Sequence, residues 1–289
     1  NAGADLSYEP AVRQLADYGP ALIDKLLRQQ APVDFDCDAR GQLDFALEAA
    51  HSKRRILHVG DATGQAIMTA MLSSLRLRPN VELLRKHTAV DLLTSPHHSV
   101  DPLAIYEKPS CHGAFVLNRD NGQMEAIQAP FTLLSTGGLG QIFLNPSNPS
   151  GARGDGLAMA YRAGARLANC EYIQFHPTTF YGAGSTKFLI SEAVRGEGAK
   201  LFNMEGERFM ERYAPEGLEL APRDVVSRAI YWEMVRTDAA HVWLDLSGAM
   251  PSDEIRQRFP SIHSYCLAQN IDISKQPIPV VPAAHYSCG

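Results

Sequence analysis

The chain has 289 residues, of which 45% are apolar and 20% charged, and its formal net charge is −5. This length can bury a sizeable core in one or two domains, and the composition is that of an ordinary globular protein. The acidic balance and the lack of any Lys/Arg block with interleaved aromatics exclude an obvious nucleic-acid surface. No apolar run approaches the roughly 20 residues of a membrane span, and no signal peptide is visible.

The five cysteines are far apart and form no C-x-x-C pair. Scattered thiols of this kind are typical of a reduced, cytosolic protein, and they predict no metal site. The chain begins at Asn1 and stops at Gly289 without a tail-like composition. We therefore expect it to be the interior of a longer protein.

Helix and strand patterns alternate over the first part of the chain. The predicted elements there are, in order, a helix over 8–30 interrupted near Gly19-Pro20, a strand over 54–60, a helix over 61–77, a strand or hairpin pair from 81–86 and 89–94, and a loop over 96–109. A clear hairpin signal follows at 113–130, where two strand-like runs flank Asp120-Asn121-Gly122.

The second part of the chain is rich in Pro-containing turns and helices. It begins at about residue 170 and includes predicted helices over 224–237 and 251–269. Before it, the first part ends with a short buried strand over 131–140, a loop over 145–153 and a helix with small faces over 154–168. Because the composition changes near residue 170, we place a domain boundary there. The first part is predicted to be α/β and the second α+β.

Two glycine-containing stretches are candidates for binding a phosphate or a sugar. Thr136, Gly137 and Gly138 end the predicted strand, and two glycines let backbone amides approach a ligand closely. A tight turn is an equally good interpretation of the same residues. Asp155 stands at a helix start, which indicates an N-cap, although its carboxylate could also accept a hydrogen bond from a ribityl or ribose hydroxyl. No G-x-G-x-x-G motif occurs in the chain.

Four side chains beside Pro, Gly or small residues accumulate in one part of the chain: His176, Arg195, Arg223 and His285. Taken singly, each histidine is most simply structural and each arginine a surface residue. Together they suit a ligand with two carboxylates, since arginine grips a planar anion through two parallel hydrogen bonds and histidine adds a tunable donor.

Several stretches resemble, in chain order, the succinate dehydrogenase/fumarate reductase flavoprotein family, and within it the aspartate oxidases. The stretches that carry the resemblance are 51–67, 80–93, 148–181, 188–201, 207–213, 220–230 and 259–289. The likeness therefore spans essentially the whole chain. An ordered set of this length makes a chance match implausible.

The resemblance implies a fold, a cofactor and a reaction. The fold is an α/β FAD-binding (Rossmann-like) domain, incomplete here, over 1–168, with an α+β capping domain over 169–284 and a return to the FAD-binding domain over 285–289. The reaction is FAD-dependent oxidation of L-aspartate to iminoaspartate, the first step toward quinolinate and NAD, with electrons passed to oxygen or fumarate. The resemblance also implies a cytoplasmic enzyme and quinolinate synthase as a partner.

Site residues carry over by position. His176, Ser191, Arg223 and His285 match the family's contacts to substrate carboxylates, with Ser191 replacing the usual Thr. Arg223 also matches a residue assigned as proton donor or acceptor. Since a guanidinium has a pKa above about 12, we favour a role for Arg223 in positioning and charge stabilisation. The matches to FAD contacts are Asp155, Ala89, Val90, Thr136, Gly137 and Gly138.

Glu48 matches a glutamate that orients the substrate amino group in aspartate oxidases. A carboxylate facing an ammonium would distinguish aspartate from succinate, although Glu48 can also be read as a surface residue. The sequence departs from the family here, because Leu47, Ala49 and Ala50 replace an arginine and two glycines. Two alternatives stay open: a fumarate reductase or succinate dehydrogenase flavoprotein subunit, and a non-catalytic fragment that lacks the phosphate-binding motif and holds no FAD.

Overall fold

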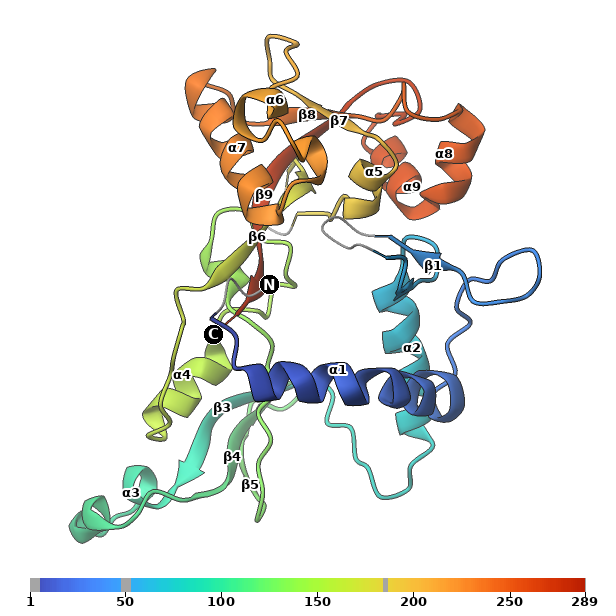
Figure 1. Ribbon diagram of the computed structural model, residues 1–289. Coiled ribbons are helices and arrows are strands. Elements are labelled where there is room, and N and C mark those ends of the chain that lie inside the picture. The colour runs from blue at the N-terminus through green and yellow to red at the C-terminus, as the bar shows by residue number, and fades with distance from the viewer. Residues whose placement is uncertain (1–5, 48–52, 184–186, 289) are drawn as a thin grey trace. The chain divides into compact units, whose positions relative to one another are not determined.

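The computed structural model describes residues 6–47, 53–183 and 187–288 (Figure 1). The chain divides into two compact units. The first contains residues 1–47, 52–83 and 258–261, and the second contains residues 48–51, 84–257 and 262–289.

The first unit is mainly helical. Its elements are α1 (Glu9–Ile23), a π-helical segment (Asp24–Gln30), the paired strands β1 (Phe45–Ala46) and β2 (Ile56–Leu57), and α2 (Thr63–Arg76). The predicted helix over 61–77 is confirmed, and the strand predicted over 54–60 is reduced to two residues. The predicted interruption near Gly19-Pro20 is wrong, because α1 runs through Pro20. The φ angle of proline is fixed near the helical value, so the backbone at Pro20 can stay helical. The π-helical segment Asp24–Gln30, whose turns are wider than those of an α-helix, follows α1.

The second unit begins with an antiparallel sheet in the order β3-β4-β5. Its strands are β3 (His87–Thr94), β4 (Cys111–Asn118) and β5 (Met124–Gln128). The predicted hairpin is confirmed, since β4 pairs with β5 across a turn in which Gly122 has φ +72°. The predicted pairing of 81–86 with 89–94 is wrong. Instead, β3 pairs with β4 from His87 to Thr94. β4 is longer than the segment 81–86, so it can form hydrogen bonds with more of the backbone N–H and C=O groups of β3.

Two further predictions fail between these strands and the second sheet. The predicted loop over 96–109 contains α3 (Ser95–His98) and a 3-10 helix (Pro102–Tyr106). The buried strand predicted over 131–140 is absent, and Phe131 and Leu133 are each 90% exposed. None of the described strands pairs with this stretch, and without a neighbour a strand cannot satisfy its backbone.

A four-stranded antiparallel sheet in the order β6-β9-β8-β7 forms the centre of the second unit. Its strands are β6 (Ile173–Phe180), β7 (Lys200–Phe202), β8 (Val242–Asp245) and β9 (Ile278–Ser287). Leu201, Leu244 and Val280 on these strands are fully buried. Burial of each such side chain contributes about 1.5–3 kcal/mol, so the sheet is the main core of this unit.

Helices surround this sheet. They are α5 (Glu192–Gly196), α6 (Met210–Tyr213), α7 (Arg223–Arg236), α8 (Ser252–Arg258) and α9 (Pro260–Ala268), with a 3-10 turn at Leu218–Leu220. A 3-10 turn at Gly140–Ile142 contacts β9, and α4 (Asp155–Arg162) packs against β3 of the other sheet. α7, orange in Figure 1, packs against β6 and β9. The helix predicted over 224–237 is confirmed, and the one over 251–269 is divided before Pro260, which disfavours helical backbone in the residue that precedes it.

The helix predicted over 154–168 is shorter than expected. It ends at Arg162, because Gly164 adopts φ +88° and closes the helix with a left-handed C-terminal turn. The domain boundaries proposed at 168 and 284 stay predictions. Among the described residues, no helix is both long enough and apolar enough to cross a membrane.

Candidate active site

Four of the predicted site residues lie together in the second unit. His176 comes from β6, Arg195 from α5, Arg223 from the start of α7 and His285 from β9. The rings of His176 and His285 approach to 5.2 Å between centroids in an edge-to-face arrangement. Arg195 and Arg223 both act electrostatically on His176, and Arg223 also acts on His285. The clustering expected from the sequence is therefore present.

Strand pairing brings the two histidines together. β6 and β9 are antiparallel neighbours, with His176 opposite Ala283 and Gln174 opposite Tyr286. The register shifts on both sides of His176, and such irregularities change the direction in which side chains point. Residues far apart in the chain thus meet on adjacent strands.

Arg223 occupies an unusual place for a cation, the first residue of α7. The positive end of a helix dipole disfavours a guanidinium there, so the charge needs a partner. Nε of Arg223 donates to Oε2 of Glu192 at 2.5 Å, and Nη1 donates to Oε1 of Gln174 at 3.2 Å. These two acceptors hold the guanidinium in place.

Glu192 is a site residue that sequence reasoning missed. Its carboxylate is only 5% exposed and lies between two arginines, with Oε2 at 2.5 Å from Arg223 and 3.9 Å from Arg195 Nη2. A buried carboxylate of this kind needs nearby cations. The signal that could have revealed it is its position three residues before Arg195, which places both on one helical face.

Arg195 is almost fully buried, with 1% of its surface exposed. Its Nη1 donates to the carbonyl of Glu219 at 2.5 Å, while Nε and Nη2 have no hydrogen-bond partner in the described part of the chain. Buried donors are rarely left without a hydrogen bond, so Nε and Nη2 are suited to donate to a bound anion, in addition to the ion pair of Nη2 with Glu192.

Both histidines are held neutral near pH 7. Burial, followed by the charge of Arg195, lowers the pKa of His176 well below its usual range, and His285 and Arg223 add to this effect. Burial and the charge of Arg223 lower the pKa of His285 to about 4. The arginines therefore carry the positive charge of this site, and the histidines act as neutral hydrogen-bonding groups.

Two other predicted substrate contacts are not joined to this cluster. The hydroxyl of Ser191 accepts a hydrogen bond from the backbone N–H of Ala193 at 3.2 Å, so it caps α5. No described contact links it to the histidines. Glu48 lies outside the described residues, and its predicted role stays a prediction.

A pocket of about 650 Å³ adjoins His285 and contains the predicted glycine turn. Thr136, Gly137 and Gly138 line it, together with the loop before α4 and the end of β9. Gly137 has φ +74°, which favours glycine. Gly156 lets Thr136 approach α4 closely, since a Cβ there would overlap the threonine hydroxyl.

The other predicted cofactor contacts lie on α4 and on the neighbouring strand β3. Asp155 is its first residue, but the predicted N-cap role is wrong: Gly154 is the N-cap, and the Asp155 carboxylate pairs with Arg153 at 3.0 Å. Ala89 and Val90 lie on β3. The carbonyl of Val90 accepts a hydrogen bond from Nη2 of Arg162 at 3.4 Å. Arg162 is the last residue of α4, which places it roughly 10 Å along the helix from Asp155. Neither Ala89 nor Val90 lines the pocket described above.

The pocket suits FAD, because a glycine-lined turn and a helix start can approach a phosphate or ribityl chain. The residues that would hold it are Thr136, Gly137 and Gly138, with Asp155 a contact carried over from the family. In the described residues no group of three or more His, Cys, Asp or Glu side chains could hold a metal ion.

Known proteins resemble this chain over its whole length. L-aspartate oxidase 1 of Ralstonia nicotianae is 47% identical over 290 residues, and L-aspartate oxidase of Pseudomonas aeruginosa is 46% identical over 293 residues. Both alignments cover 100% of this chain but only 52% and 53% of those proteins. The chain thus spans about half the length of the curated relatives it matches.

Solved structures show the same fold. The flavoprotein chain of a structure described as "Quinol-Fumarate Reductase with Menaquinol Molecules" superposes with a TM-score of 0.82 at 26% identity, covering 96% of this chain and 48% of that one. "Mycobacterium smegmatis Sdh1 in complex with UQ1" gives a TM-score of 0.70 at 31% identity, covering 94% and 45%. The predicted fold class is confirmed.

The family model described as "FAD binding domain" matches residues 1–289. This match, together with the aspartate oxidase relatives, confirms the family resemblance and FAD as the cofactor of the family. The chain belongs to the FAD-binding domain family that includes the flavoproteins of succinate dehydrogenase and fumarate reductase.

Proposed function

We propose that the protein oxidises L-aspartate to iminoaspartate. Aspartate loses two electrons and two protons in this reaction, and bound FAD would supply the two-electron acceptor. Oxygen or fumarate would then take the electrons. The proposal is supported by relatives named L-aspartate oxidase and by a cluster of side chains suited to a dicarboxylate.

The observation that carries the proposal is the buried guanidinium of Arg195 beside Arg223, whose Nε and Nη2 have no hydrogen-bond partner among the described residues. Two arginines around the single carboxylate of Glu192 leave a net positive charge, which an anionic substrate can neutralise. The neutral histidines add hydrogen bonds without repelling the arginines. A dicarboxylate can use both features, because it carries two planar anions.

Arg223 positions the substrate in this proposal and does not act as a general base. Its two described acceptors, Glu192 and Gln174, fix the direction of the guanidinium before substrate binds. A fixed cation stabilises negative charge without reorganising, and it holds the substrate Cα in one orientation. FAD would bind along the Thr136–Gly138 turn, beside His285.

The alternative is a fumarate reductase or succinate dehydrogenase flavoprotein. The observation that favours it is that the cluster of arginines and histidines is suited to carboxylates, which succinate and fumarate share with aspartate. Discrimination would depend on the amino group, for which Glu48 is the proposed partner. A partnership with quinolinate synthase also stays a proposal.

The deciding experiment uses the full-length protein. Absorbance in the flavin region first establishes whether FAD is bound, and a non-catalytic fragment would show none. Aspartate and succinate are then compared as substrates with a dye as electron acceptor. We expect aspartate to be oxidised much faster, and preferential oxidation of succinate would instead support the alternative.

A further inference from the structure

His285 is held from one side by the loop that precedes α4. The backbone N–H of Ala284 donates to the backbone carbonyl of Asn145 at 2.8 Å, and the backbone N–H of Ser147 donates to the backbone carbonyl of Ala284 at 2.9 Å. The side-chain amide of Asn148 donates to the carbonyl of His285 at 2.7 Å. These bonds fix the backbone on both sides of the histidine, so a side chain from this loop can meet the ring in one geometry.

Ser147 makes that contact. Its Oγ lies 2.6 Å from Nδ1 of His285, a short distance for a hydrogen bond that involves a hydroxyl. In the described part of the chain, Ser147 is the only hydrogen-bond partner of the His285 ring. The remaining ring nitrogen, Nε2, is therefore the one that can serve a ligand.

The hydroxyl has one proton and lies near two groups: Nδ1 of His285 at 2.6 Å, which accepts or donates according to the tautomer, and the carbonyl of Ala284 at 3.2 Å, which only accepts. The carbonyl already accepts the N–H of Ser147 at 2.9 Å. The 2.6 Å contact to Nδ1 lies within the range of hydroxyl donors and is shorter than the range of N–H···O bonds, whereas 3.2 Å to the carbonyl is long for a hydroxyl donor. The proton is therefore best placed on the bond to Nδ1.

We propose that Ser147 donates its hydroxyl proton to Nδ1 of His285 and so holds this histidine as the neutral tautomer with its proton on Nε2. A neutral imidazole has one donor and one acceptor, and the bond at one nitrogen decides the role of the other. With Nδ1 as acceptor, Nε2–H becomes a donor. Ser147 is thus a positioning residue for the site.

The burial and the charge of the site favour a neutral His285 ring. His285 is faced by Arg223 from α7 and by His176 from β6, so protonation of its ring is opposed. A neutral ring binds a carboxylate only through an N–H, and the opposite tautomer would turn a lone pair toward the anion. The inference rests on the proposed function in this respect, because it assumes that the ligand is a carboxylate.

The test reads the tautomer directly by long-range ¹H–¹⁵N NMR of the full-length protein labelled at histidine. Near pH 7 we expect Nδ1 of His285 to resonate as an unprotonated nitrogen and Nε2 as a protonated one. A protonated Nδ1 would overturn the proposal. This readout requires neither substrate nor turnover.

Variants extend the test. Ser147→Ala should raise the pKa of His285 by about one pH unit, because the neutral ring loses one hydrogen bond, and it should raise KM for aspartate about ten-fold with a smaller change in kcat. Ser147→Thr keeps the hydroxyl and should restore both values. Ser247→Ala removes a hydroxyl that bonds Asp245 in a distant turn and serves as the matched control.

The outcomes separate this inference from the proposed function. An Nε2–H tautomer in a protein that turns over no dicarboxylate would refute the proposed function and leave the assignment of Ser147 intact. Turnover of aspartate with unchanged KM and His285 pKa in Ser147→Ala would refute the assignment alone. If Ser147→Ala does not fold, the wild-type spectrum still decides the tautomer.

Discussion

Arg223 is the residue through which the site is most directly tested. Its guanidinium is held by Glu192 and Gln174 at the start of α7, next to both histidines. We expect Arg223→Leu in the full-length protein to lower turnover by at least ~100-fold, because positioned charge-stabilising groups contribute that much. FAD absorbance should be unchanged.

Arg228→Leu is the matched control for this prediction. Arg228 lies further along α7, is 64% exposed and pairs with Asp224 at 2.7 Å. Loss of an exposed ion pair should cost little stability and leave turnover near the wild-type value. Near-normal turnover in Arg223→Leu would make Arg223 an ordinary residue of a helix start.

Glu48 is the residue proposed to select aspartate over succinate. Burying an ammonium without a partner costs several kcal/mol. Glu48→Gln keeps the shape but removes the charge, so aspartate oxidation should fall by roughly ten- to a hundred-fold, or about 1.4–2.8 kcal/mol. Fumarate reduction by the same preparation should survive, since fumarate has no amino group. Parallel loss of both activities would assign Glu48 a structural role.

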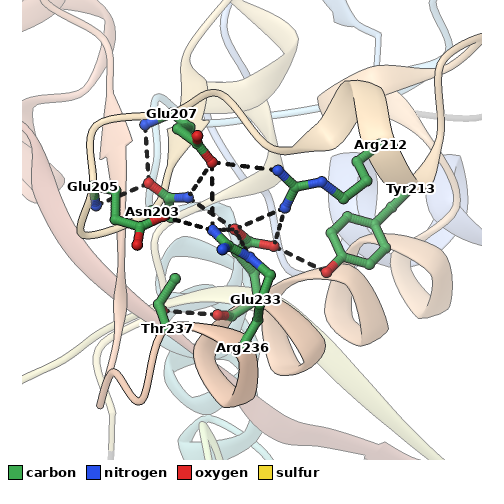
Figure 2. A network of polar contacts seen from close by, with 8 residues as sticks. All are labelled: Asn203, Glu205, Glu207, Arg212, Tyr213, Glu233, Arg236 and Thr237. Atoms are coloured by element: carbon green, nitrogen blue, oxygen red, sulfur yellow. Dashed lines mark hydrogen bonds and ion pairs between the residues drawn. The ribbon is translucent and has the colours of Figure 1, made fainter.

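At the scale of elements, α7 connects the site to a network of charges. Arg223 begins the helix, and Glu233, in its last turn, is fully buried. Figure 2 shows Glu233 surrounded by Arg212, Arg236 and Tyr213, each with a hydrogen bond to its carboxylate. Asn203 adds a fourth donor at 2.8 Å. A buried carboxylate with this many donors is well satisfied.

This network predicts an acid-dependent contribution to stability. Burial opposes ionisation of Glu233, but hydrogen bonds from Arg236, Asn203 and Tyr213 outweigh it and lower the pKa of Glu233 from 4.5 to about 2. A lowered folded-state pKa gives stability that is present above pH 4.5 and is lost as the pH falls toward 2. The contribution at neutral pH is on the order of 3 kcal/mol.

Glu233→Gln should therefore lower the free energy of unfolding by about 2–3 kcal/mol at pH 7 and reduce its pH dependence between pH 5 and pH 3. Urea unfolding at several pH values measures both effects. Glu254→Gln in α8 is an exposed counterpart that should change stability by less than about 0.5 kcal/mol. An equal pH dependence in Glu233→Gln and the wild type would remove Glu233 as its source.

At the scale of the whole molecule, the proposed boundary near residue 168 can be tested by proteolysis. Residues 163–172 form neither helix nor strand, and Arg166 within them is exposed. We expect limited trypsin digestion to cut after Arg166 before it cuts at Arg228, which is also exposed but lies within a helix. Mass spectrometry identifies the fragments, and earlier cleavage within α7 would contradict the boundary.

Local patterns were sufficient for several features. The hairpin around Asp120 and Gly122, the helix α2 and most of α7 follow from turn chemistry and helical periodicity, which depend on neighbours in the chain. The association of His176, Arg195, Arg223 and His285 was also predicted, because each carries side-chain chemistry suited to an anion. These features need little information from elsewhere in the molecule.

Other features required the tertiary structure. The strand predicted over 131–140 does not form, since strand formation depends on a partner and not on apolar residues alone. Glu192 was missed because its burial between Arg223 and Arg195 depends on where α7 meets α5. The contact between Ser147 and His285 joins residues far apart in the chain, and no spacing rule reports it.

The sequence by itself determined the family, the cofactor and the residue types of the proposed anion site, because these follow from ordered motifs and side-chain chemistry. Tertiary structure alone decided which partners each charged group has. Strand pairing sets β6 beside β9, and burial then removes water from His176 and Arg195. Pairing distance and desolvation control the protonation and direction of these groups, and neither quantity is a property of the linear chain.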